Sequence, residues 1–291
     1  MWQQKSFQQN YEYGTLYLVP TPIGNLEDMT FRAIKVLKES SVIAAEDTRQ
    51  TKKLCNYFEI DTPVISYHEH NKQVSGEKII SYLRAGKDVA LVSDAGMPTI
   101  SDPGYEVVVE AILEKFYVVP LPGANAALTA LTASGISTQP FYFFGFLDRQ
   151  KKEKRKQLEG LKHIQASLLF YEAPHRLKET LHIMEEVLGN RKITVSRELT
   201  KKFEEFIRGD LKELIAWTDV DVIRGEFSII VEGSKEGEEK VEEFWWQQLS
   251  VEEHVNHYIN TSSLSSKDAI KKVAKDRNQP KRDIYQEYHI E

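Results

Sequence analysis

The sequence predicts an α/β fold of two lobes followed by a small helical domain. Short β-branched runs alternate with amphipathic stretches through the first 235 residues, an order typical of parallel sheets covered by helices. The length of 291 residues corresponds to about two domains of about 150 residues each. The last forty residues differ in kind, because two short amphipathic segments flank a turn there.

The elements follow from local patterns. Strands are predicted where β-branched and aromatic residues gather in short runs between turn residues, at 15–19, 42–45, 63–66, 89–92, 117–119, 141–144, 167–171, 192–196 and 227–231. Helices are predicted where apolar residues recur at helical spacing, at 29–39, 48–58, 76–84, 104–113, 124–134, 174–188 and 211–216.

Composition shifts suggest the domain limits. A turn-like connector around Gly135 to Pro140 separates a first lobe, 14–136, from a second lobe, 137–233. Segment 234–249 is predicted to be an acidic linker, since Ser234 to His254 holds seven acidic residues against two basic ones. Residues 250–291 are predicted to form a small domain resembling a helix-turn-helix unit, although a solvated helical hairpin would have the same pattern.

Composition also excludes several classes of protein. A chain with 41% hydrophobic and 28% charged residues is neither wholly disordered nor fibrous. The single cysteine, Cys55, cannot form an internal disulfide, and residues 1–13 lack the apolar core of a signal peptide, so we expect a cytoplasmic protein. The uncharged stretch 116–147 is broken by prolines and glycines and is not expected to span a membrane. A net charge of −6 disfavours indiscriminate nucleic-acid binding, so an RNA partner requires a local basic patch.

Polar residues follow each of the first five predicted strands. The segments are Pro20-Thr-Pro-Ile-Gly, Glu46-Asp-Thr-Arg, Tyr67-His-Glu-His-Asn, Ser93-Asp-Ala-Gly with the nearby Ser101-Asp-Pro-Gly, and Pro122-Gly-Ala-Asn. Each alone is explained by turn or helix-cap chemistry. A parallel sheet, however, places all five loops along one edge, where ligands bind. No dinucleotide or P-loop glycine motif is present in the expected context.

A metal site is not expected. His68 and His70 would share a face of a strand, with Glu69 between them. Zinc needs three or four ligands, and the chain contains neither a thiolate cluster nor an H-E-x-x-H helix.

The order of these motifs resembles the ribosomal RNA small subunit methyltransferase I family, within the tetrapyrrole methylase superfamily. The resemblance runs from about Gly14 to Gly233, includes Phe170-Tyr-Glu-Ala-Pro-His-Arg, and extends to the C-terminal helices. It implies two α/β lobes with S-adenosylmethionine in the cleft between them and a homodimeric enzyme. It also implies methylation of a cytidine ribose 2′-oxygen in the decoding region of 16S ribosomal RNA, free or in the small ribosomal subunit.

The resemblance also implies site residues. Cofactor contacts fall on Ile23, Asp94, Met97, Ala124 and Asn125, with Tyr171 as a neighbour from the second lobe. Departures from the superfamily pattern speak against a tetrapyrrole substrate: Pro20 and Pro22 stand in place of glycines, and Ser93-Asp-Ala stands in place of Gly-Asp-Pro. Within the RNA-modifying branch a threonine is usual at the position of Met97, so this residue is expected to contact the cofactor through its backbone.

Several cations are expected to bind RNA. Arg49 and Arg176 suit bidentate phosphate contacts. The run Arg149-Gln-Lys-Lys-Glu-Lys-Arg-Lys carries six positive charges and one negative charge, and we expect Lys151, Lys152, Lys154, Arg155 and Lys156 to contact RNA. A solvated helix face is the alternative for this run. The rival functions for the chain are a tetrapyrrole C-methyltransferase and a non-catalytic RNA-binding protein.

The proton acceptor is the least constrained residue. Asp47 and Glu46 follow the second strand and His68 follows the third, so a carboxylate and an imidazole together could deprotonate the 2′-hydroxyl. We expect Asp47, Arg49, Glu46 and His68 to be catalytic. In the alternative, Asp47 only fixes Arg49 on a phosphate and the proton leaves to water. If neither Asp47 nor His68 is needed for turnover, Glu172 or His175 becomes the next candidate.

Overall fold

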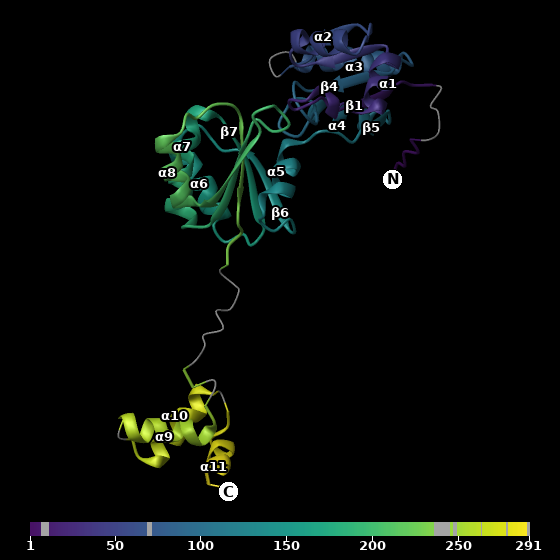
Figure 1. Ribbon diagram of the computed structural model, residues 1–291. Helices are drawn as coiled ribbons and strands as arrows, with labels where there is room; N and C mark the ends of the chain where they lie inside the picture. Colours follow the sequence, from purple (N-terminus) through teal and green to yellow (C-terminus); the bar gives the residue numbers. More distant parts are fainter. Residues whose placement is uncertain are drawn as a thin grey trace. The chain divides into compact units, whose positions relative to one another are not determined.

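The computed structural model describes residues 1–6, 12–68, 72–235, 245–246, 249–262, 264–277 and 279–289. The chain divides into two compact units, Met1–Ser234 and Lys235–Glu291. The first unit contains two five-stranded sheets, and the second is helical (Figure 1).

The first sheet is entirely parallel, as the sequence predicts, with the strand order β3-β2-β4-β1-β5. Its strands are β1 (Thr15–Val19), β2 (Val42–Ala45), β3 (Val64–Ser66), β4 (Val89–Val92) and β5 (Tyr117–Pro120). The connecting helices are η1 (Leu26–Asp28), α1 (Phe31–Glu39), α2 (Thr48–Tyr57), α3 (Lys72–Arg84) and α4 (Tyr105–Leu113).

Alternation along the strands buries both faces of this sheet. In β2, Ile43 and Ala45 pack under α1 and α2, whereas Val42 and Ala44 pack under α3 and α4. Because all four are apolar, the strand is a continuous hydrophobic run, which is typical of a parallel sheet covered on both sides. The register aligns Ala45 with Val92 and Val19 with Val92, so the carboxyl ends of β1, β2 and β4 lie at one edge.

The second sheet is mixed, which corrects the expectation of parallel sheets in both lobes. Its order is β6-β7-β10-β8-β9, and only β6 and β7 are parallel. The strands are β6 (Phe141–Phe146), β7 (Ser167–Glu172), β8 (Lys192–Arg197), β9 (Glu205–Asp210) and β10 (Phe227–Val231). β10 enters between β7 and β8 and runs antiparallel to both, a long-range pairing that local patterns do not encode.

Strand β9 was not predicted from the sequence. Its residues Glu205, Arg208 and Asp210 give it a polar pattern, and it pairs only with β8, at the edge of the sheet. Charged side chains are common on edge strands because they discourage pairing with other chains.

The helices of the second lobe are α5 (Ala126–Ser134), α6 (Lys151–Leu161), α7 (Pro174–Leu188) and α8 (Leu211–Val220). Figure 1 shows α6, α7 and α8 on one side of the sheet and α5 on the other. Ala127, Ala130 and Leu131 of α5 pack against Leu169 and Ile230 of the second sheet. The sequence pattern had placed this segment in the first lobe. Its small apolar residues allow close helix-to-sheet contact, so by packing α5 belongs to the second lobe.

The second unit contains α9 (Val251–Ser262), α10 (Ser266–Asp276) and α11 (Lys281–His289). Val255, Ile270, Val273 and Ile284 form its core, so three helices pack together rather than the expected two. Ser265 caps α10 by accepting a hydrogen bond from the Asp268 N–H. Most of the expected acidic linker lies outside the described residues, at 236–244 and 247–248.

No helix among the described residues is long and apolar enough to cross a membrane. The 116–147 stretch contains β5, α5 and β6, as its prolines and glycines predict.

Candidate cofactor and substrate site

A cavity of about 470 Å³ lies in the first unit, between loops from the carboxyl edge of the first sheet and a wall formed by β6, β7, β10, the start of α7 and the loop after β8. This volume is in the range of small-molecule sites, which is about 300–1,000 Å³. Its lining from the loops after β1, β4 and β5 and from the start of α5 is Ile23, Asp94, Ala95, Gly96, Met97, Ile100, Ser101, Asp102, Asn125 and Ala126. Its second-lobe lining is Phe146, Tyr171, Glu172, Ala173, Pro174, His175, Glu198, Leu199, Lys201, Glu226, Phe227 and Ser228.

The turn after β4 is held rigidly against the loop after β1. Backbone hydrogen bonds join Thr21 and Gly96 in both directions, at 3.0 and 2.9 Å. The buried Ser93 hydroxyl donates to the Gly96 carbonyl at 2.9 Å, and the Thr21 hydroxyl donates to the Ser93 carbonyl at 3.0 Å. Gly96 has φ +80°, and a Cβ there would lie 3.3 Å from Ile23 Cγ2. The turn therefore requires glycine, and its backbone forms part of the cavity wall.

The start of α5 forms another part of the wall. Asn125 caps α5 by accepting a hydrogen bond from the Leu128 N–H at 2.9 Å. The Tyr171 hydroxyl, from β7, accepts one from the Ala127 N–H at 3.0 Å, and the Tyr171 ring packs against Phe146. Burial raises the pKa of Tyr171. Of the six predicted cofactor residues, five line the cavity. Ala124 does not, although its carbonyl oxygen lies near Gly96.

The cavity lining is rich in carboxylates. Among the described residues that line it, five are acidic (Asp94, Asp102, Glu172, Glu198 and Glu226), against one lysine, Lys201. Apolar side chains such as Ile23, Met97 and Phe146 line it as well. This combination fits a ligand that carries positive charge and a flat apolar ring system.

A second cavity, of about 710 Å³, adjoins the first. The two cavities share Ile23, Asp94, Ala95, Lys201 and Glu226 in their walls. The second cavity is also lined by Asp47, Gln50 and Lys53, from the loop after β2 and from α2. Ligands in the two cavities would therefore meet at the wall that contains Asp94.

The Asp47 carboxylate is hydrogen-bonded to the start of α2 and to the Arg49 side chain. Its carboxylate caps the helix by accepting the Arg49 N–H at 2.8 Å, and it binds the Arg49 guanidinium at 3.1 and 2.8 Å. These hydrogen bonds from Arg49 lower the pKa of Asp47 to about 2. A carboxylate with this pKa is a poor proton acceptor near neutral pH, which opposes the expectation that Asp47 is the base. It agrees with the alternative that Asp47 orients Arg49, whose side chain is 86% exposed.

The other two expected catalytic residues line neither cavity. Glu46 follows β2 and His68 follows β3, the edge strand of the first sheet. Glu69 and His70 lie outside the described residues. Within the described part of the chain, no group of three or more His, Cys, Asp or Glu could hold a metal ion.

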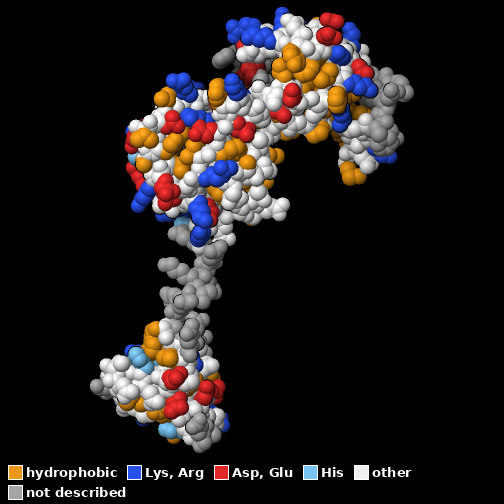
Figure 2. Space-filling model, in the orientation of Figure 1, with side chains coloured by type: hydrophobic (Ala, Val, Ile, Leu, Met, Phe, Trp, Pro, Cys, Tyr) orange, Lys and Arg blue, Asp and Glu red, His pale blue; other side chains and the backbone are white. Residues whose placement is uncertain are grey.

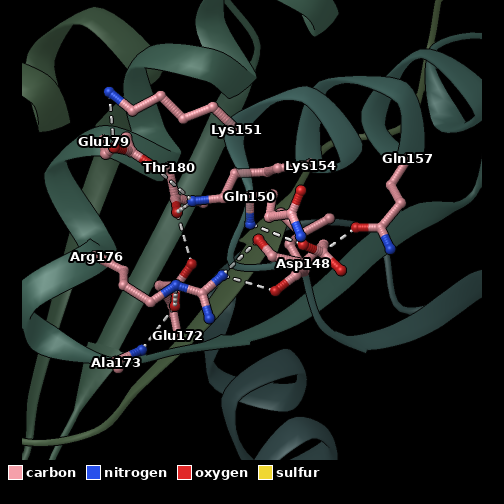
Figure 3. A network of polar contacts seen from close by, with 11 residues as sticks. Asp148, Gln150, Lys151, Lys154, Gln157, Glu172, Ala173, Arg176, Glu179 and Thr180 are labelled. Carbon is pink, nitrogen blue, oxygen red and sulfur yellow. Dashed lines mark hydrogen bonds and ion pairs between the residues drawn. The ribbon is translucent and has the colours of Figure 1, made fainter.

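Lys154 is a correction to the expected RNA-binding run. Its side chain is 0% exposed, and its ammonium lies 2.9 Å from the Thr180 hydroxyl and 3.2 Å from Glu179 (Figure 3). Lys154 therefore cannot contact RNA. Its spacing from Leu158 and Leu161 on α6 puts it on the buried face, a periodicity visible in the sequence.

The other lysines and the arginine of α6 are exposed at the surface. Lys151 pairs with Glu179 and Arg155 with Glu186, whereas Lys152 and Lys156 are exposed and have no ion pair with any described residue. Lys152 and Lys156 are therefore the cations of this helix most available to a phosphate.

Arg176 is a second correction. Its guanidinium donates to the Leu147 and Asp148 carbonyls at 2.6 and 2.8 Å, and its Nε lies 3.2 Å from the Glu172 carboxylate (Figure 3). The side chain is only 15% exposed. Arg176 thus holds the loop after β6 against the end of β7 and is not placed to contact phosphate.

Much of the second-lobe wall was not predicted from the sequence. Glu198, Leu199 and Lys201 follow β8, and Phe227 and Ser228 begin β10. No local signal marks them, because their place depends on the strand order of the mixed sheet. Ser101 and Asp102 belong to the Ser101-Asp-Pro-Gly segment singled out in the sequence, but turn chemistry explains that segment equally well.

Comparison with solved structures supports the fold. A uroporphyrin-III C-methyltransferase from Thermus thermophilus, complexed with S-adenyl homocysteine, matches with a TM-score of 0.54 and 20% identity over 75% of this chain and 97% of that chain. A cobalt precorrin-4 methyltransferase of cobalamin biosynthesis matches with a TM-score of 0.58 and 17% identity over 75% and 94%.

Curated relatives match over nearly the whole chain. A ribosomal RNA small subunit methyltransferase I from Bacillus subtilis is 64% identical over 287 residues, 99% of this chain and 98% of the relative. The protein of the same name from Halalkalibacterium halodurans is 59% identical over 288 residues, 99% of both. The model of the tetrapyrrole (corrin/porphyrin) methylases matches residues 15–215. The chain therefore belongs to the tetrapyrrole methylase family and, within it, to the ribosomal RNA small subunit methyltransferase I family.

Proposed function

We propose that this protein uses S-adenosylmethionine to methylate the ribosomal RNA of the small subunit, at the ribose 2′-oxygen of a cytidine in the decoding region of 16S RNA. The observation that carries the proposal is a carboxylate-rich cavity that shares a wall with a larger, more polar cavity. The names of the full-length relatives supply the substrate class. The specific nucleotide and oxygen come from the family resemblance.

The 470 Å³ cavity suits this cofactor. When bound, S-adenosylmethionine supplies an activated methyl group on a positively charged sulfonium. The lining carboxylates attract that charge, and the close backbone at Ala95 and Gly96 leaves room for a flat adenine ring. Asn125 and Asp94 present polar groups to the same space.

The adjoining 710 Å³ cavity suits the reacting nucleotide. Lys53 lines it, and Arg49, held by Asp47, extends into solvent beside it. Exposed Lys152 and Lys156 on α6 add cations for the RNA backbone. The chain's main contribution would be to align the ribose hydroxyl with the methyl group, since positioning can supply about 7–11 kcal/mol of the barrier.

A second copy of the chain is part of the proposal. Large hydrophobic side chains reach the surface of the first unit, as orange patches in Figure 2. On α4, Tyr105, Ile112 and Leu113 are exposed by 68%, 45% and 76%. An exposed apolar face on one helix favours association, here as a homodimer. With a ribosomal RNA substrate, we expect the activity in the cytoplasm.

The test is methyl transfer with isotope-labelled S-adenosylmethionine to three acceptors: small ribosomal subunits, free 16S RNA and a uroporphyrin-type tetrapyrrole. Mass spectrometry of digested RNA is expected to find the label as 2′-O-methylcytidine, and none on the tetrapyrrole. Label on the tetrapyrrole alone would instead establish the rival C-methyltransferase, and RNA binding without any transfer would establish a non-catalytic protein. Label on a base rather than on ribose would refute the 2′-oxygen assignment alone.

A further inference from the structure

Asp102 lies in the cavity wall on the loop that connects β4 to α4. Ile100 and Ser101 precede it and also line the cavity, and Gly104, with φ +139°, ends the loop at the start of α4. A Cβ at Gly104 would lie 2.8 Å from the Thr99 side chain and 2.9 Å from Leu91. The end of the loop is therefore packed closely against Leu91 of β4 at Gly104, two residues after Asp102.

The Asp102 carboxylate is half-buried and accepts no hydrogen bond or ion pair from any described residue. The other carboxylates of the wall differ. Asp94 accepts the Asp47 N–H at 2.9 Å, and Glu198 pairs with Lys201. Glu172 accepts the Thr180 hydroxyl and the Ala173 N–H. Glu226 is also without such a bond, but it is exposed to water.

The surroundings of Asp102 are negatively charged. Glu46, in the loop after β2, and Asp94, in the turn after β4, repel its negative charge, and its charge acts in turn on Tyr171 of β7. The other ionisable groups of the wall are Glu172, His175, Glu198, Lys201 and Glu226. Burial first, then Glu46 and Asp94, raise the pKa of Asp102 to about 6.

A carboxylate in this position is suited to general-base catalysis. At pH 7 to 8 it is mostly ionised and ready to accept a proton, and its basicity is far greater than that of Asp47, whose pKa is about 2. Asp94, which repels it, lies in the wall shared by the two cavities. Asp102 itself lines the 470 Å³ cavity and not the second one, so the ribose hydroxyl would meet it by reaching past the shared wall into the methyl donor's cavity.

We propose that the Asp102 carboxylate accepts the proton of the ribose hydroxyl during methyl transfer, an assignment that rests on the proposed function. The hydroxyl O–H bond breaks and its proton moves to Asp102. The oxygen uses the released electron pair to form a bond to the methyl carbon, and the carbon–sulfur pair stays on sulfur, which becomes a neutral thioether. The protonated Asp102 then returns its proton to water.

The test compares Asp102→Asn with Asp61→Asn, a matched change at an exposed residue that lines neither cavity. Single-turnover methylation of small subunits, at saturating S-adenosylmethionine, is expected to fall about 10²–10⁴-fold in Asp102→Asn and to stay unchanged in Asp61→Asn. The Kd of S-adenosylhomocysteine, measured by calorimetry, is expected to stay within about threefold of wild type, since the carboxylate acts on the RNA hydroxyl.

The pH profile supplies the second readout. The wild-type rate is expected to rise tenfold per pH unit below an inflection near pH 6 and then level off. Glu46→Gln removes a repelling charge and is expected to move the inflection to lower pH, which tests the assignment even if Asp102→Asn does not fold. An unchanged rate in Asp102→Asn, a loss of S-adenosylhomocysteine affinity that matches the loss of rate, or an unmoved inflection in Glu46→Gln would overturn the assignment. Label transfer to RNA by the wild type separates these outcomes from failure of the proposed function.

Discussion

Two loops leave the same edge of the first sheet, and each carries an aspartate with a different environment. The loop after β2 starts a helix at once, so Asp47 becomes its cap and binds the Arg49 guanidinium. The loop after β4 runs further before α4, so Asp102 reaches the cavity wall, where burial and the charges of Glu46 and Asp94 raise its pKa. The same side chain is thus held as a fixed anion in one loop and as a proton acceptor in the other.

The largest expected effect is the difference between two identical substitutions. Asp102→Asn is expected to lower the single-turnover rate about 10²–10⁴-fold at pH 7.5. Asp47→Asn is expected to lower it by at most about tenfold, because asparagine still caps a helix and only the grip on Arg49 weakens. Both rates are measured on small ribosomal subunits. Equal losses in the two variants would remove the distinction between the loops.

Asp94 connects the two loops, because it accepts the Asp47 N–H and also repels Asp102. Asp94→Ala removes a carboxylate from both cavities, and we expect the Kd of S-adenosylhomocysteine to rise about tenfold, the loss of about 1.4 kcal/mol. Calorimetry measures this directly. An unchanged Kd in a folded variant would make Asp94 a turn residue only.

The lysines of helix α6 differ in the same way, because Lys152 and Lys156 are exposed whereas Lys154 is buried. Replacing Lys152 and Lys156 with alanine is expected to flatten the dependence of log RNA affinity on log salt by about 0.7–0.9 for each phosphate that the helix no longer neutralises. Lys154→Met is expected to leave that slope unchanged and to lower stability by about 1–3 kcal/mol, since Glu179 and Thr180 lose a buried partner. Binding titrations and urea unfolding separate the two effects, and a change of slope in Lys154→Met would contradict the burial of Lys154.

The smallest expected effect is on how the folding stability of the protein changes with pH. Asp47 has a lowered pKa, so its contribution is fully present above pH 3.8 and is lost as pH falls toward about 2. Asp102 has a raised pKa, so its ionisation opposes folding as pH rises from 3.8 through about 6. At pH 7.5 Asp102→Asn is therefore expected to keep or raise Tm, and Asp47→Asn to lower it. Calorimetric melting of both variants is the measurement, and a reversed order would count against the pKa directions.

Much of the fold could be predicted because its strands and helices follow from short-range patterns in the sequence. All five strands of the first sheet and their parallel direction were predicted, since β-branched runs such as Val42–Ala45 and Val89–Val92 are apolar throughout and alternate with helices. The second sheet could not be, because inserting β10 between β7 and β8 is a long-range choice. Strand β9 was missed because its charged residues interrupt the hydrophobic pattern of a strand, although such residues are common in edge strands.

The candidate site was predictable to a similar extent. The resemblance to a known family located the cofactor residues on the first-lobe loops and Tyr171, and all but Ala124 line the cavity. It gave no indication of which residue accepts a proton, because that depends on the partners of each carboxylate. Arg176 shows the same limit, since its partners are the Leu147 and Asp148 carbonyls and Glu172, which the local sequence does not identify. The burial of Lys154, by contrast, could have been predicted from its helical spacing to Leu158 and Leu161.

The difference between Asp47 and Asp102 is measured most directly by NMR titration of aspartate carboxyl groups in the full-length protein labelled at aspartate Cγ. Asp47→Asn and Asp102→Asn assign the two signals by their disappearance. We predict that the Asp102 signal titrates with a pKa of about 6 and that the Asp47 signal stays ionised down to about pH 2. Titration of Asp102 at about 3.9, the ordinary value for aspartate, would contradict its role as the proton acceptor.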